Sequence, residues 1–148
     1  RVFVFLSLLF LGSISKGQLS INYYPFQSIA SLSSDSEKKL WIDLRVESNT
    51  FISNLNFELD VMYNFKRDNY YNAYVGLGYN FNPFYGLDDL AFSNGYLLHM
   101  GIRLKPWQKH KALQIGMEIS PYFNANFDGA VLRSLLGITY DFKLKENG

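Results

Sequence analysis

Two neighbouring segments of the chain, residues 55–66 and 71–82, alternate apolar and polar side chains with a period of two. This is the period of a β-strand, so each segment has one apolar and one polar face. The intervening residues 67–70 are few and polar, which predicts a long antiparallel hairpin. The twelve apolar side chains constrain the fold because they must be covered by something other than water. They are Leu55, Phe57, Leu59, Val61, Tyr63, Phe65, Tyr71, Ala73, Val75, Leu77, Tyr79 and Phe81.

The same alternation recurs in four further segments, and no segment after residue 17 shows a convincing helical period. We therefore expect an all-β protein built of antiparallel hairpins. Residues 19–23 and 26–33, on either side of a bend at Pro25, are expected to supply two more strands, giving eight strands in an up-and-down barrel. A single strand over residues 18–33 would make the number odd. The four further segments are 40–47, 96–105, 113–120 and 136–144.

The amino end of the chain carries an apolar run, residues 2–11, that is too short to span a bilayer. Ser15 and Gly17 follow at the spacing of a cleavage site before Gln18. We expect residues 1–17 to be a secretory signal peptide and residues 18–148 to form one barrel domain; a buried first strand or an anchor helix is the alternative. The chain contains no Cys, so it is expected to fold without disulfides after export.

Alternation alone does not distinguish a membrane barrel, apolar outside, from a soluble lipocalin-like periplasmic ligand carrier, apolar inside. A soluble barrel would carry many Lys and Glu residues on its polar face, whereas this face is rich in Asn and Gly. Small residues leave room for bulky inward neighbours such as Trp41, Tyr74 and Arg103 in a narrow lumen. We therefore expect a transmembrane barrel with a polar, side-chain-filled lumen. The glycines on the polar face are Gly76, Gly78, Gly101, Gly116 and Gly137.

Charged residues make up 18% of the chain, and the net charge of +1 offers no basic stripe for nucleic acid. The charges on the polar face balance, which predicts that they pair with one another inside the lumen. Lys66, Lys105 and Lys143 are expected instead at solvated strand ends. The basic set is Arg45, Lys66, Arg103, Lys105, Arg133 and Lys143, and the acidic set is Asp43, Glu47, Glu58, Asp60, Glu118 and Asp141.

The connections between strands differ in length in the way that bacterial outer-membrane barrels show. If the last strand runs toward the periplasm, the long connection 83–94 and the turn 124–129 lie outside the cell, and the compact connection 106–111 lies in the periplasm. A barrel of eight strands is too narrow for a porin channel, which takes about sixteen strands. Aromatic side chains near the strand ends fit the girdles of such barrels. They are Tyr63, Phe65, Tyr71, Tyr79, Phe81, Tyr96, Tyr140 and Phe142.

Five short pieces of sequence carry a family resemblance: residues 15–18, 74–79, 101–107, 118–122 and 136–142. In these pieces the chain resembles small outer-membrane β-barrel proteins of Bacteroidota. The resemblance implies a place in the cell outer membrane as a porin-like, OmpA-like barrel without the periplasmic domain. It also implies contact with outer-membrane lipid and lipopolysaccharide, and insertion by the barrel assembly machinery, with Phe142 as the counterpart of a terminal aromatic signal. It indicates no oligomeric state.

The sequence predicts no catalytic, cofactor-binding or metal-binding residues and a structural or surface-binding role through the outer loops. His99 is expected to fill the lumen and to hydrogen-bond a carboxylate, and His110 to be solvated. Asp88 and Asp89 are expected to serve solubility, because a Ca²⁺ site needs six or more oxygens; a cation held by the two carboxylates is the alternative. The alternative is an outer-membrane lipid-modifying enzyme such as a lipid A deacylase, whose barrel resembles the one expected here. That resemblance implies a His and a Ser close together on the outer surface. Met100 and Gly101 follow His99, so that pattern is missing.

Overall fold

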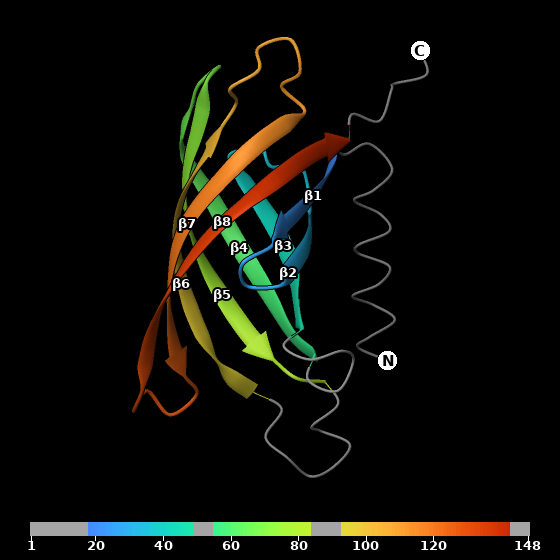
Figure 1. Cartoon of the computed structure of the whole chain (residues 1–148). Helices are drawn as coiled ribbons and strands as arrows, with labels where there is room; N and C mark the ends of the chain where they lie inside the picture. Colours follow the sequence, from blue (N-terminus) through green and yellow to red (C-terminus); the bar gives the residue numbers. More distant parts are fainter. Residues whose placement is uncertain (1–17, 49–54, 84–92, 143–148) are drawn as a thin grey trace, which may run out of the picture.

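The structure is a computed structural model that describes residues 18–48, 55–83 and 93–142. Within these ranges, eight antiparallel strands form a closed barrel in chain order (Figure 1). The expected signal peptide, Asp88, Asp89 and Lys143 lie outside the described residues. The strands are β1 (Leu19–Tyr24), β2 (Ile29–Ser33), β3 (Leu40–Ser48), β4 (Leu55–Arg67), β5 (Tyr71–Phe81), β6 (Ser93–Leu104), β7 (Leu113–Asn124) and β8 (Ala130–Phe142).

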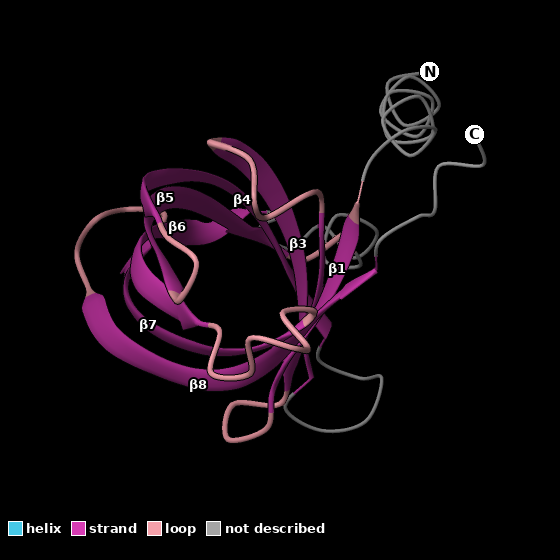
Figure 2. Ribbon diagram, turned by 90° about the horizontal axis from the view of Figure 1, so that it is seen from above, coloured by secondary structure: helices cyan, strands magenta, loops and turns pink. Residues whose placement is uncertain are grey.

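The hairpin of β1 and β2 decides the strand number. A turn that contains Pro25 joins the two strands, and Tyr24 lies opposite Ile29 in their register. β1 then closes the barrel against β8, with Leu19 opposite Phe142 (Figure 2). The predicted eight-stranded, up-and-down barrel is therefore confirmed. We call the end that holds Leu19 and Phe142 the terminal end and the opposite end the mouth. No described helix is long and apolar enough to cross a bilayer.

β8 begins at Ala130, well before the predicted segment 136–144. The sequence pattern is blurred here because Leu135 is apolar yet lies on the inward face, where it is 3% exposed. Leu135 packs inside the barrel with Tyr24 and Ile29. This small apolar cluster breaks the alternation that marks the rest of the strand.

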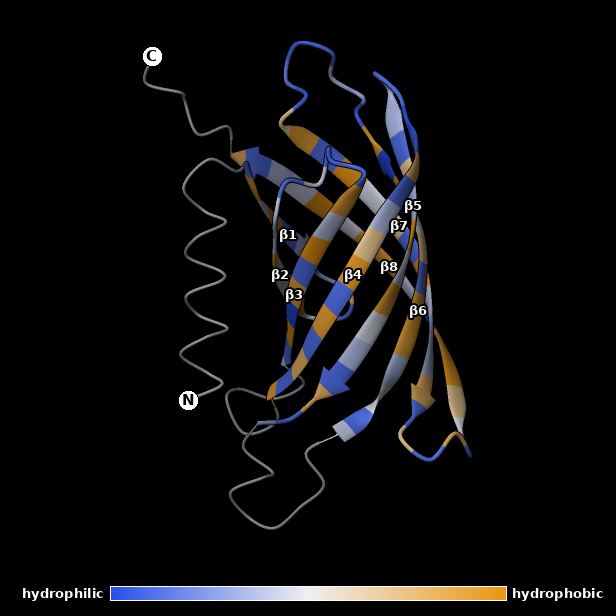
Figure 3. Ribbon diagram, turned by 180° about the vertical axis from the view of Figure 1, so that it is seen from behind, coloured by the Kyte–Doolittle hydropathy of each residue, from blue (hydrophilic) through white to orange (hydrophobic). Residues whose placement is uncertain are grey.

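The two faces of the sheet differ sharply in chemistry. Apolar side chains point outward, and hydropathy alternates residue by residue along β4 (Figure 3). Leu77 is 65% exposed and Ile138 is 55% exposed, whereas Asp60 and Arg45 are 0% and 1% exposed. The barrel thus places its charged groups inside and its aliphatic groups on the outer surface.

Aromatic rings form a continuous band around part of the mouth. Phe57, Phe81, Tyr79, Tyr96 and Phe127 contact one another in that order, with ring centroids 6.0, 5.6, 5.6 and 5.4 Å apart. These residues come from β4, β5, β6 and the turn before β8. We call them the mouth band. A second group near the terminal end includes Tyr63, Phe65, Tyr140 and Phe142, all of them exposed.

The barrel wall is uneven in height. β1 and β2 contain 6 and 5 residues, whereas β4 and β8 contain 13 each. β1 pairs with β8 only between Ile138 and Phe142, and no strand within the described ranges pairs with residues 130–137 on that side. Figure 1 shows β1 and β2 confined to the part of the wall near the end of β8. We call residues 130–137 the free edge of β8.

Candidate functional site

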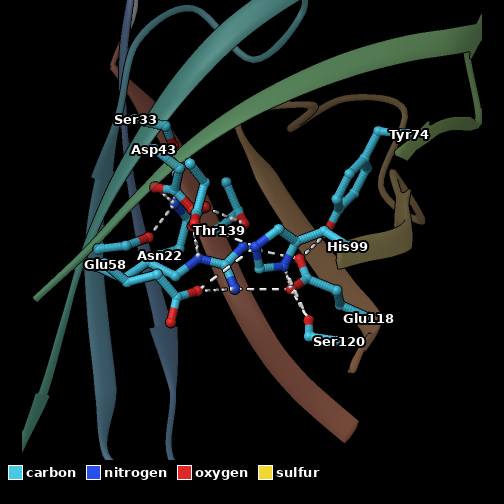
Figure 4. A network of polar contacts seen from close by, with 12 residues as sticks. Asn22, Ser33, Asp43, Glu58, Tyr74, His99, Glu118, Ser120 and Thr139 are labelled. Atoms are coloured by element: carbon cyan, nitrogen blue, oxygen red, sulfur yellow. Dashed lines mark hydrogen bonds and ion pairs between the residues drawn. The ribbon is translucent and has the colours of Figure 1, made fainter. Parts of the chain in front are cut away.

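The lumen holds an ion network built on Arg45 of β3. Figure 4 labels Glu118, Asp43 and His99 of this network. The Arg45 Nε lies 2.8 Å from Asp43 and 3.0 Å from Asp60. Its Nη1 and Nη2 donate to the two carboxylate oxygens of Glu118 at 2.7 and 2.8 Å. The planar guanidinium suits such a bidentate pair, and its Nε–H donates to Asp43, with Asp60 near enough for an ion pair. One buried cation is thereby shared among three buried carboxylates.

His99 of β6 completes this network. Its Nδ1 lies 2.8 Å from Glu118 and 3.0 Å from the Ser120 hydroxyl, and its Nε2 lies 3.1 Å from Asp60. Each ring nitrogen therefore faces a carboxylate, an arrangement that an imidazolium with two N–H donors satisfies best. The prediction that His99 fills the lumen and bonds a carboxylate is confirmed. His110 is exposed, as predicted.

The structure brings together Ser120, His99 and Asp60, a set that sequence reasoning missed. Met100 lies opposite Ile119, so His99 and Ser120 face each other across β6 and β7. Only the pairing register of β6 with β7 reveals this set, because the three residues are not neighbours in the sequence. The Ser120 hydroxyl donates to Glu118 instead of to His99. Ser120 is also fully buried, which keeps it from any substrate approaching from solvent or lipid.

Three buried donors, Glu58, Asp60 and His99, lie close enough to hold a metal ion, with their ligand atoms within 4.8 Å of one another. The Arg45 guanidinium already lies against this set, 3.0 Å from Asp60 and 3.7 Å from Glu58. A cation bound there would compete with that positive charge. The expectation of no metal site stays a prediction.

A cluster of uncharged polar side chains lines the lumen beside the short strands β1 and β2. The Asn22 amide donates to the hydroxyls of Ser31 and Ser33 at 2.7 and 2.8 Å, and its oxygen accepts from Thr139 at 2.6 Å. These residues come from β1, β2 and β8. The polar lumen thus continues across the seam where the barrel closes.

Arg103 lies between two aromatic rings, 4.3 Å from the centroid of Trp41 and 5.7 Å from that of Tyr74. All three residues point inward and are buried, as predicted. The Tyr74 hydroxyl donates to Glu118 at 2.6 Å, which ties this cation–π layer to the Arg45 network. A Cβ at Gly101 would collide with the Tyr74 ring, so glycine at this position makes room for the bulky neighbour.

Polar side chains around Glu37 close the terminal end of the lumen. Glu37, in the turn between β2 and β3, accepts hydrogen bonds from Lys105 at 2.7 Å and from Asn72 and Gln114 at 3.1 Å each. The Asn64 amide donates to two backbone carbonyls of the same turn. We call residues 34–39 the terminal plug. Burial alone would raise the pKa of Glu37, but its hydrogen bonds outweigh burial and hold the pKa below its ordinary value.

The plug corrects one prediction about lysines. Lys105 is only 5% exposed and binds Glu37 inside the lumen, so its expected place at a solvated strand end is wrong. The reason is that the acidic partner lies in a turn, which the alternation of strands does not reveal. Lys66 is exposed, as predicted.

Toward the mouth, Arg133 of β8 crosses the lumen to β4. Its Nη1 and Nη2 donate to both carboxylate oxygens of Glu58 at 3.1 and 2.9 Å, and Glu47 lies 4.0 Å away. A cavity of about 660 Å³ lies at this level. We call it the mouth cavity; its lining includes Glu47, Asn56, Asn80, Asn94, Tyr122, Asn124, Asn126, Val131, Leu132 and Arg133.

Comparisons with known proteins add little to this geometry. No protein-family model matches the chain, and no curated protein matches it significantly. Among solved structures, the chain is similar to the outer membrane protein Ail of Yersinia pestis, determined as a backbone structure in a phospholipid bilayer nanodisc. The sequences are 15% identical, the TM-score is 0.44, and the match covers 85% of this chain and 98% of that chain. A likeness at this level says nothing about what the chain does.

Proposed function

We propose that this chain is an integral protein of the bacterial outer membrane, a closed barrel without catalytic activity that acts through its structure and its outer surface. The observation that carries the proposal is the inversion of the barrel relative to a soluble one. Leu77, Met100 and Ile138 are more than half exposed, whereas Arg45, Asp60 and Glu118 are at most 3% exposed. Exposing such an apolar outer surface to water costs free energy, whereas exposing it to lipid does not. The same inversion disfavours the lipocalin-like carrier.

The backbone arrangement supports the same placement. In lipid every backbone N–H and C=O group needs a partner, and a closed barrel supplies partners between strands. A tilted strand needs about 9–11 residues to cross the hydrocarbon region. β4, β6 and β7 contain 13, 12 and 12 residues. The mouth band and the aromatic group at the terminal end then lie at the two interfaces.

The lumen is obstructed at three levels, which favours a structural or binding role over transport. The terminal plug, the Arg45 network and the Arg133–Glu58 pair follow one another along the barrel. A charged group inside such a barrel is stable only when it is paired and hydrogen-bonded, and these groups are. The partners we propose are outer-membrane lipid, lipopolysaccharide and the barrel assembly machinery, with Phe142 in the assembly signal. Binding through the outer turn 124–129 is part of the same proposal; most of the other predicted loop, 83–94, lies outside the described residues.

Site-directed spin labelling tests the membrane placement. The chain has no Cys, so Leu77→Cys and Ile138→Cys each give one labelled site, and Lys109→Cys serves as the aqueous control. In lipid vesicles, the labels at 77 and 138 should be relaxed by oxygen and protected from a water-soluble nickel chelate. The label at 109 should show the reverse. Free access of the nickel chelate to positions 77 and 138 would overturn the proposal.

The Ser120, His99 and Asp60 arrangement is the one observation that favours the lipid-modifying enzyme as a second candidate. His99 Nδ1 lies 3.0 Å from the Ser120 hydroxyl, and His99 Nε2 lies 3.1 Å from Asp60. These distances are in the range found between a nucleophile, its base and the group that orients the base. A fluorophosphonate probe would label an activated serine, and purified lipopolysaccharide would be deacylated. We expect neither reaction. Labelling that disappears in Ser120→Ala but persists in Ser134→Ala would establish the enzyme.

A further inference from the structure

The free edge of β8 and the mouth cavity meet at one place in the wall. The cavity lining includes Leu132, whose side chain lies on the outer face of β8, and Arg133, whose side chain lies on the inner face. These residues belong to the free edge of β8, which no described strand covers on the β1 side. Val131, like Arg133, lies on the inner face of β8 by the alternation of the strand, and yet it is 65% exposed. Among the described residues, the mouth cavity is therefore open sideways, above the short hairpin of β1 and β2.

The register places this opening at lipid depth, given the membrane placement proposed above. Ala130 lies opposite Phe123, and Phe123 lies opposite Tyr96 of the mouth band. Leu132 and Leu136 follow on the terminal side of that level and point outward, with 68% and 44% of their surface exposed. The turn 124–129, which the sequence predicts outside the cell, lies at the mouth. In that orientation the free edge lies below the aromatic interface, beside the acyl chains of the outer leaflet.

An added β-strand is a poor occupant for this opening. Alternate residues of a strand direct both backbone groups to the same side, so Leu132 and Leu136 share the orientation of Ser134. The Gln27 side chain already donates to the Ser134 carbonyl at 2.6 Å, in the middle of the free edge. A pairing strand would have to displace Gln27. The edge is therefore interrupted as a template for a partner chain.

The lining chemistry indicates an amphiphile. Val131 and Leu132 offer apolar contact beside the lipid, and side-chain amides dominate the interior of the cavity. The positive charge of Arg133 is neutralised by its bidentate pair with Glu58, and Glu47 adds a further acid nearby. Amides donate and accept hydrogen bonds without carrying charge, so they suit hydroxyl groups. An anionic head group would find no free cation here among the described lining residues.

We propose that the mouth cavity binds a non-ionic, hydroxyl-bearing amphiphile that enters sideways from the outer leaflet. The acyl or alkyl chain passes over the free edge of β8 at Leu132, and the head group rests among Asn56, Asn80, Asn94 and Asn124. The Arg133–Glu58 pair forms the floor of the cavity. Because the Arg45 network and the terminal plug lie beyond that floor, the site binds its ligand and does not conduct it across the membrane.

Photolabelling in nanodiscs tests the proposal. The probe is an alkyl glucoside that carries a diazirine in its chain, and mass spectrometry maps the labelled residues. We expect labelling concentrated at residues 131–133 that saturates with concentration and is displaced by unlabelled dodecyl maltoside. The same chain with a phosphate head group should not displace it.

Matched variants separate the site from bulk lipid. Val131→Trp fills the cavity at an exposed position and should abolish saturable labelling. Ala130→Trp is the control, because Ala130 is exposed, neighbours the mouth band and does not line the cavity. Even, unsaturable labelling of all outward residues, unchanged labelling in Val131→Trp, or cross-linking of the free edge to a second chain would overturn the inference.

The experiment also distinguishes this inference from the proposed function on which it rests. A diazirine-bearing phospholipid in the same nanodisc should label Ile138, which faces outward on the paired part of β8. Labelled Ile138 without saturable labelling at 131–133 contradicts the lateral site alone. Unlabelled Ile138 contradicts the membrane placement itself.

Discussion

Arg45 of β3 and Glu118 of β7 form a bidentate ion pair across the barrel, with nitrogen–oxygen distances of 2.7 and 2.8 Å. In an eight-stranded barrel, β3 and β7 lie on opposite walls. Both side chains are nearly or fully buried, so the pair acts as a cross-brace inside the lumen. Tyr74 and His99 donate to the same carboxylate and hold it in place.

Breaking this brace should destabilise the barrel more than replacing it. Arg45→Met or Glu118→Gln leaves an uncompensated charge in the lumen, which costs about 3 kcal/mol or more of unfolding free energy. The double variant Arg45→Met, Glu118→Gln should cost less than the sum of the single variants. Urea unfolding in lipid vesicles measures all three, with the exposed Lys66→Gln as the control. Additive losses would show that the two groups do not interact.

The fold followed from local sequence because strand alternation is a local property. The faces of β4 and β5 could be assigned residue by residue, since a shift of one position would turn Leu77 inward and Gly78 outward. The bend at Pro25 was enough to separate β1 from β2. The alternation did not predict the first part of β8, because Leu135 is apolar and yet lies in a small apolar cluster inside the polar lumen.

The lumen contacts could be predicted as a class but not as pairs. The prediction that the inward charges pair holds for Arg45 and Arg133 but is wrong for Arg103, whose buried guanidinium has no hydrogen-bond partner among the described residues and lies against aromatic rings. Which charges meet depends on register and on strands far apart in the chain. His99 and Ser120 are brought together by the pairing of β6 with β7. Glu37 was overlooked because it lies in a turn, where no periodicity identifies an inward residue. The opening above β1 and β2 depends on strand lengths, which alternation fixes poorly.

Glycine substitutions should separate crowded from open positions on the inner face. Gly101→Ala places a Cβ against the Tyr74 ring, whose hydroxyl is held by Glu118, whereas Gly116→Ala meets its nearest atoms at 4.0 Å. We expect Gly101→Ala to cost about 1–3 kcal/mol through overpacking. Gly116→Ala should be close to neutral. Urea midpoints of the two variants provide the comparison, and equal midpoints would argue against crowding by Tyr74.

The barrel should carry no steady ionic conductance of porin size in planar bilayers. The terminal plug, the Arg45 network and the Arg133–Glu58 pair obstruct the lumen in series, so removing one of them leaves the others in place. Glu37→Ala alone and Arg45→Ala with Glu118→Ala alone should therefore remain closed. A variant that combines these three changes with Glu58→Ala and Arg133→Ala should show a higher conductance than either. A wild-type barrel with stable open channels would contradict the obstructed lumen.

The terminal plug should make the stability of the barrel sensitive to acid. The pKa of Glu37 is lower in the folded protein than its ordinary value of 4.5, because Lys105, Asn72 and Gln114 stabilise the carboxylate against the effect of burial. A group with a depressed folded pKa contributes stability above its ordinary pKa, and this contribution is lost as the pH falls through the folded value. Glu37→Gln should therefore lower the unfolding free energy at pH 7 and flatten its decline in acid. Urea unfolding at a series of pH values checks this, with Asp68→Asn in an exposed turn as the control. Parallel pH profiles for wild type and Glu37→Gln would mean that the carboxylate does not hold the plug.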